Sequence, residues 1–89
     1  MSKREALARA IFILRGEPYG QTAADVNQNI RSQDLTRPYH PRCGLPRWQW
    51  VFNVTAPNVA NHGQGAINGW LCIDAVTGEI GMASLPYIH

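Results

Sequence analysis

Bulky and smaller side chains alternate with a period of two through residues 48–55. The bulky series is Trp48, Trp50, Phe52 and Val54. Because successive side chains of a β-strand point to opposite faces of its sheet, this alternation predicts a strand with one heavily aromatic face. In a small domain, large rings that face a helix supply most of the buried area. We therefore expect Trp50 and Phe52 in the core and leave Trp48 open between core and surface.

The segment Asp74-Ala-Val-Thr-Gly78 is typical of a tight turn between two strands. The carboxylate of Asp74 can accept hydrogen bonds from the turn amides, and Gly78 can adopt the left-handed conformation that such a turn requires. The flanking residues predict one strand over residues 70–74 and a last strand from Glu79 to about Leu85. The end of the chain is therefore expected to form an antiparallel hairpin.

Helix-start signals occur twice before the aromatic strand. Ser2-Lys-Arg-Glu5 is a capping-box pattern, and apolar residues follow it at helical spacing as far as Leu14. Thr22-Ala-Ala-Asp25 resembles a second capping box and predicts a shorter helix that extends to about Ser32. The first half of the chain is therefore expected to supply the helices of the fold.

The composition fits a single small globular domain. The 89 residues are 45% hydrophobic and 16% charged, which excludes an intrinsically disordered chain. Joined to the strand and helix signals, this composition predicts one α+β domain over residues 1–89. In it, an N-terminal helix, with or without a second short helix, packs on a three- to four-stranded antiparallel sheet.

The low proportion of charged residues also predicts self-association. A small domain with three tryptophans has difficulty hiding its apolar area alone, and isologous pairing is the commonest solution. We expect a homodimer that forms through helix faces or through an unpaired sheet edge. Its interface is predicted to include Phe12, Trp48 and Trp70.

The core pattern leaves two polar segments unexplained. Residues 34–46 form a connector with three prolines and a glycine, and residues 58–69 form a loop rich in Gly and Asn. Within that loop, Asn68-Gly69 could instead form a tight turn with a short strand before it. Loops at the edge of a rigid scaffold often carry recognition, and Arg and Tyr are enriched among interface anchors. The predicted partner-binding residues are Arg37, Tyr39, Arg42 and His62.

Charge and segment composition argue against nucleic-acid and membrane partners. The formal net charge is +2, and the basic residues between 31 and 47 are typical of a solvated connector, so nucleic-acid binding is not expected. No run approaches the ~20 apolar residues of a membrane span, and no secretory signal precedes the first helix. We therefore expect a cytoplasmic protein with reduced thiols and without a disulfide.

The candidate ligands for a metal ion are His40, Cys43, His62 and Cys72. Structural zinc sites usually carry two closely spaced ligand pairs, whereas His62 and Cys72 are well separated in the sequence. A Cys–His nucleophilic pair would also need an orienting group and an oxyanion hole, which no motif supplies. We therefore predict no catalytic residues, no metal and no cofactor, and a small metal-binding protein is the least favoured alternative.

The N-terminal helix, the Trp48-x-Trp-Val51 strand and the Ile73-Asp-Ala-Val-Thr-Gly-Glu-Ile80 hairpin together resemble PepSY-like domains. In these small modules a helix packs on a cystatin-like antiparallel sheet, and the resemblance covers residues 3–15 and 48–84. It implies binding or inhibition of another protein, often a peptidase, without catalysis. The chain differs from that family in its proline-rich connector, its longer loop and its lack of an export signal.

A second resemblance is to small bacterial toxin-immunity proteins. It rests on Trp50-Val-Phe52 and on the final strand pair with its Asp-Ala-Val-Thr-Gly turn. The two resemblances point to related roles, since both families act by contact with another protein. We therefore predict a non-catalytic protein-binding or inhibitory module, and the alternative is a toxin-immunity protein that binds its target through loops.

Overall fold

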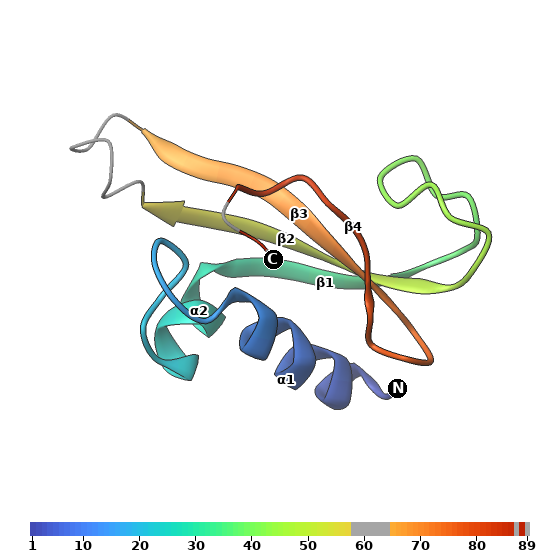
Figure 1. The fold of residues 1–89 in the computed structure, drawn as a ribbon, viewed down its shortest axis with the longest axis horizontal. Helices are drawn as coiled ribbons and strands as arrows, with labels where there is room; N and C mark the ends of the chain where they lie inside the picture. Colours follow the sequence, from blue (N-terminus) through green and yellow to red (C-terminus); the bar gives the residue numbers. More distant parts are fainter. Residues whose placement is uncertain (58–64, 87, 89) are drawn as a thin grey trace.

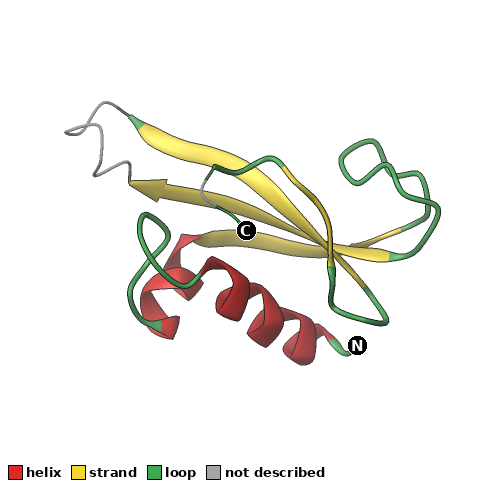
Figure 2. Cartoon of the chain, viewed as in Figure 1, coloured by secondary structure: helices red, strands yellow, loops and turns green. Residues whose placement is uncertain are grey.

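The computed structural model describes residues 1–57, 65–86 and 88. In chain order these residues form α1 (Lys3–Leu14), α2 (Ala23–Asn29), β1 (Ile30–Thr36), β2 (Gln49–Pro57), β3 (Ala66–Asp74) and β4 (Ile80–Ala83). The strands make one antiparallel sheet in the order β1-β2-β3-β4, and both helices lie on the same side of it (Figures 1 and 2). The predicted α+β fold is confirmed.

The first helix begins at the predicted capping box. The Ser2 hydroxyl accepts a hydrogen bond from the Glu5 amide at 3.1 Å, and the Glu5 carboxylate accepts one from the Ser2 amide at 2.9 Å. These two bonds satisfy amides that the first turn of a helix leaves without an intrahelical acceptor. Ala6, Ala10 and Leu14 form the buried face of α1, and this spacing matches the helical period that the sequence shows.

The second helix is shorter than predicted, and a strand that the sequence did not reveal follows it directly. Thr22 caps α2 by accepting a hydrogen bond from the Asp25 amide at 3.2 Å, but the helix ends at Asn29. The next residues, predicted as helix and connector, pair instead with β2 as strand β1. None of the helices in the described residues is long and apolar enough to cross a membrane.

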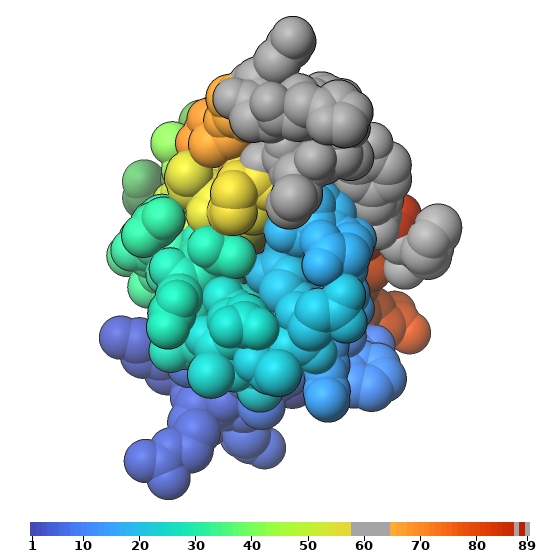
Figure 3. All heavy atoms as spheres, turned by 90° about the vertical axis from the view of Figure 1, so that its left-hand side faces the viewer, coloured from blue at the N-terminus to red at the C-terminus, as the bar shows by residue number. Residues whose placement is uncertain are grey.

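The core lies between the helices and the sheet. Phe52 of β2 is fully buried there with Leu71 and Ile73 of β3, and Trp50 packs against this cluster. The predicted core positions of Phe52 and Trp50 are therefore confirmed, whereas 51% of Trp48 is exposed. At the far end of the sheet, α2 and the segment 15–22 lie side by side next to the end of β2 (Figure 3).

The loop between β2 and β3 is shorter than predicted. Asn68 and Gly69 belong to β3, where they lie opposite Thr55 and Val54 of β2, so the alternative of a tight turn at these two residues is wrong. The two strands pair continuously as far as Pro57 and Ala66. Asn and Gly are depleted in strands, and long-range pairing with β2 outweighs that local preference here.

The hairpin between β3 and β4 has the predicted turn. Gly78 has a φ of 75°, and one carboxylate oxygen of Asp74 accepts hydrogen bonds from the amides of Val76 at 2.7 Å and Thr77 at 2.9 Å. The other oxygen lies 3.4 Å from an Nη1 atom of Arg47. The hydrogen bonds from Thr77 and Val76, and to a smaller extent Arg47, hold the pKa of Asp74 below its usual value.

We expect Asp74→Asn to lower the free energy of unfolding at pH 7 by about 1 kcal/mol, because a neutral amide oxygen accepts the turn bonds more weakly than a carboxylate does. A lowered folded-state pKa adds stability that is present above the unfolded pKa of about 4 and is lost as the pH falls through the folded pKa. The difference between wild type and variant should therefore shrink in acid. Urea unfolding from pH 7 to pH 3 measures it.

The matched control is Asp34→Asn, which removes a carboxylate from an exposed position of β1. Its effect on stability is expected to stay within about 0.5 kcal/mol at every pH. An Asp74→Asn variant that followed the wild-type curve across the whole pH range would contradict the assignment of this turn.

Candidate functional site

The segment between β1 and β2 folds back over the face of the sheet that the helices leave uncovered. We call residues 37–48 the disulfide-bonded loop, because Cys43 in it is joined to Cys72 of β3, with Cα atoms 5.8 Å apart. Both cysteines are buried with Val51 of β2, and Trp70 packs against this second cluster. The loop is therefore attached at its middle to the centre of the sheet.

The expectation of reduced thiols without a disulfide is wrong for this structure. The two cysteines are 29 residues apart in the sequence, and they meet because β2 pairs with both β1 and β3. Neither cysteine is a free thiol, so neither can serve as a thiolate metal ligand or as a nucleophile. Of the other two candidate ligands, His62 lies outside the described residues, and His40 lies in the loop.

Hydrogen bonds along its backbone give the disulfide-bonded loop a defined shape. The Tyr39 amide bonds to the Leu45 carbonyl at 2.8 Å, and the amides of Cys43 and Gly44 both bond to the His40 carbonyl. Tyr39 has a φ of 62°, the left-handed conformation that a non-glycine residue adopts rarely. In this conformation the loop leaves 72% of the Tyr39 residue exposed.

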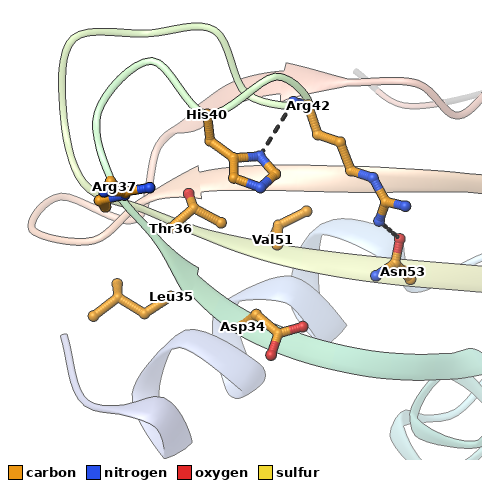
Figure 4. A pocket seen from close by; sticks show the side chains of 8 residues that line it. All are labelled: Asp34, Leu35, Thr36, Arg37, His40, Arg42, Val51 and Asn53. Carbon is orange, nitrogen blue, oxygen red and sulfur yellow. Dashed lines mark hydrogen bonds between the residues drawn. The ribbon is translucent and has the colours of Figure 1, made fainter.

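A hollow of about 410 Å³ lies between this loop and strands β1 and β2 (Figure 4). Its charged and polar walls come from both sides, with Arg37, His40 and Arg42 on the loop and Asp34 and Asn53 on the strands. Val51 contributes apolar surface from β2. The hollow can therefore offer hydrogen bonds and charge to a ligand group of modest size.

Arg42 is held at the edge of the hollow by contacts with two strands. Its guanidinium donates a hydrogen bond to the Asn53 side chain and lies 5.4 Å from the centre of the Trp70 ring. The Trp70 indole nitrogen donates to the Arg42 carbonyl at 3.0 Å, and Asn53 donates in turn to the Ser32 hydroxyl at 2.6 Å. This network orients the guanidinium through both its backbone and its side chain.

The structure brings together three of the four predicted partner-binding residues. Arg37 and Arg42 line the hollow and Tyr39 is exposed on the same loop, whereas His62 lies outside the described residues. Asp34 and Asn53 were missed as site residues. Their positions beside the loop depend on the pairing of β1 with β2, and no local sequence motif indicates that pairing.

The predicted dimer residues lie in different surroundings. Phe12 on α1 is 72% exposed, with the Arg9 guanidinium 5.5 Å from the centre of its ring, and Trp48 is half-exposed at the last position of the disulfide-bonded loop, directly before β2. Trp70 lies on the opposite face of the sheet from the core and is engaged by Arg42. These three side chains therefore do not form one continuous patch.

Comparisons of this chain with protein-family models, with curated proteins and with solved structures found no match. The resemblances to PepSY-like domains and to toxin-immunity proteins therefore stay predictions. Fold alone does not define function, so the function has to be argued from the loop, the hollow and their side chains.

Proposed function

We propose that this protein is a non-catalytic binding module that contacts another protein through the disulfide-bonded loop. The observation that carries the proposal is the combination of a covalent attachment at Cys43 with an outward-facing Tyr39 on the same loop. A loop that only connects two strands needs neither a covalent bond to the sheet nor an exposed tyrosine. This function agrees with the binding role that both family resemblances imply.

A loop of defined shape favours binding because less conformational entropy is lost when the complex forms. Tyr and Arg are the residue types most often found as energetic anchors of interfaces, together with Trp. Arg37, Tyr39 and Arg42 are all exposed, and Arg37 and Arg42 line the hollow. A toxin-immunity protein would use the same surface, so the identity of the captured partner separates this alternative from a general binding or inhibitory role.

The proposal is tested by capture from source cells with the wild type and with an Arg37→Ala/Tyr39→Ala/Arg42→Ala variant. Captured proteins are identified by mass spectrometry, and affinities are then measured with the purified partner. The triple variant should bind at least tenfold more weakly, as expected when anchor residues worth more than about 1.4 kcal/mol are removed. Its melting temperature should change little, because the disulfide and the core are intact.

Phe12→Ala is the control variant for this experiment. It removes an exposed aromatic side chain of α1, outside the disulfide-bonded loop, so partner capture should stay at the wild-type level. Capture that survives the triple change but fails in Phe12→Ala would mean that the loop is a connector and that the partner binds elsewhere.

Self-association is our second proposal for partners. Exposed Phe12 and Trp48 favour it, as does the position of β1 at the edge of the described sheet with one strand neighbour. Light scattering at high micromolar concentration measures it, and a mass of 9.9 kDa would contradict a homodimer. The predicted cytoplasmic location stays untested, and the disulfide favours an oxidising compartment over a reducing one.

A further inference from the structure

The hollow beside the disulfide-bonded loop carries more positive than negative charge. Arg37 and Arg42 line it, and Asp34 is the one carboxylate among its described lining residues. The ion pair between Arg47 and Asp74 lies outside the hollow. When arginines and carboxylates are counted, the wall carries two positive charges and one negative charge, a balance of +1. A ligand group with a single negative charge would neutralise it.

We propose that this hollow binds the carboxylate of an acidic side chain, Asp or Glu, on the partner protein. The inference rests on the proposed function, because it names the chemistry of the partner group that the loop receives. A phosphate monoester carries about 1.5 to 2 negative charges at pH 7, which exceeds the balance of the wall and would be repelled by Asp34. The charge balance therefore favours a carboxylate.

His40 supplies the first hydrogen-bond donor. Its Nδ1 atom accepts a hydrogen bond from the Arg42 amide at 3.2 Å. A neutral imidazole whose Nδ1 is an acceptor carries its proton on Nε2, which is then a donor. The ring projects from the loop toward β2, and its second nitrogen points away from the Arg42 backbone (Figure 4). The Nε2–H group is therefore directed into the space between loop and sheet.

Arg42 supplies the second set of donors. A guanidinium has five N–H groups in a planar fork, and the hydrogen bond to Asn53 uses the Nη1 side of that fork. The Asn53 hydrogen bond and the cation–π contact with Trp70 hold the guanidinium in place, so an incoming carboxylate meets donors that are already oriented. Arg37 adds charge from the other side of the hollow. The Asp34 carboxylate can accept hydrogen bonds from backbone N–H groups next to the bound carboxylate. The hollow would therefore favour an acidic side chain that is part of a peptide segment.

The test is an NMR titration of the oxidised protein with a capped Gly-Gly-Glu-Gly-Gly peptide, its Gln counterpart and inorganic phosphate. The Glu peptide should shift the signals of the Trp70 indole, the Asn53 amide group and the Arg42 backbone in a saturable manner. The Gln peptide should bind at least fivefold more weakly, and phosphate should bind more weakly than the Glu peptide. Equal binding of the two peptides, or tighter binding of phosphate, would overturn the proposal.

Two variants and a matched control assign the binding to the hollow. Arg42→Gln and Arg37→Gln should each weaken the Glu peptide at least fivefold, whereas Arg31→Gln should leave its affinity unchanged. Arg31 is an exposed arginine of β1 that does not line the hollow, so its replacement changes the net charge of the protein equally. An equal loss in Arg31→Gln would show general charge attraction and would refute the site.

The peptide result and the partner result can fail separately. If the Glu peptide does not bind but the triple loop variant loses its partner, the loop recognises other chemistry and the carboxylate inference is wrong. If the peptide binds as expected but the partner is captured by the triple variant, the proposed function of the loop is wrong while the carboxylate site stands.

Discussion

A Cys43→Ala/Cys72→Ala variant is expected to lose about 3.5 kcal/mol of unfolding free energy relative to the oxidised protein. Loss of a crosslink between residues 29 apart restores conformational entropy to the unfolded chain, and loop-closure arguments place the effect between about 3 and 4 kcal/mol for a loop of this length. For a domain of this size, a total stability of 5–15 kcal/mol is typical, so the loss is a large fraction of it. Urea unfolding of the two proteins measures the difference.

Wild-type protein unfolded in the presence of a dithiol reductant is the matched control. It has the same composition as the oxidised protein but lacks the crosslink, so it should lose a similar amount of stability. A titration of free thiols must find none in the native protein and two after reduction. If the oxidised and reduced proteins unfold at the same urea concentration, the disulfide does not stabilise the fold and its assigned role is incorrect.

The Cys43→Ala/Cys72→Ala variant is also expected to bind a partner of the loop more weakly. Without the bond to β3, the disulfide-bonded loop keeps its hydrogen bonds but loses its covalent attachment to the sheet, so Tyr39 and Arg42 sample more orientations. A partner that binds this loop should then bind less tightly, because ordering of the loop becomes part of the cost of association. Binding measured in a variant that remains folded separates this effect from global unfolding.

The features predicted correctly from the sequence are those with local causes. The capping box of α1 joins Ser2 to Glu5, and the β3–β4 turn joins Asp74 to amides two and three residues later. Such contacts form between neighbours in the chain, so their residue types are sufficient to indicate them. The aromatic strand was recognised for a similar reason, since a period of two appears directly in the sequence of β2.

The candidate site could not be predicted in the same way because it depends on contacts between distant residues. The polar sequence of β1 shows no clear alternation, and its strand form follows from pairing with β2. That pairing places Asp34 beside the disulfide-bonded loop. It also brings the loop over β2 and β3, where Cys43 forms its disulfide with Cys72. The residue types of Arg37, Tyr39 and Arg42 were sufficient to predict them as binding candidates. The hollow could not be predicted, because it forms only when the loop lies beside β1 and β2.

Gly69→Ala is expected to destabilise the fold by about 3 kcal/mol, although the substitution adds a single methyl group. A Cβ atom at this position would lie 2.0 Å from the Ser84 carbonyl oxygen and 2.8 Å from a methyl carbon of Leu85. The Ser84 amide is bonded to the Trp70 carbonyl at 2.8 Å, which holds that backbone against β3. The strand or the segment after β4 must therefore move, and overpacking against backbone costs more than a rotamer change.

Two further variants separate this clash from other effects of changing β3. Asn68→Ala, at the exposed neighbouring position, should cost less than about 0.5 kcal/mol. Leu85→Ala removes the side-chain contact with the new methyl group but leaves the Ser84 carbonyl in place, so it should not rescue Gly69→Ala. If Gly69→Ala unfolds at the wild-type urea concentration, the segment after β4 does not lie against Gly69. In that case, close backbone approach is not the reason for glycine at this position.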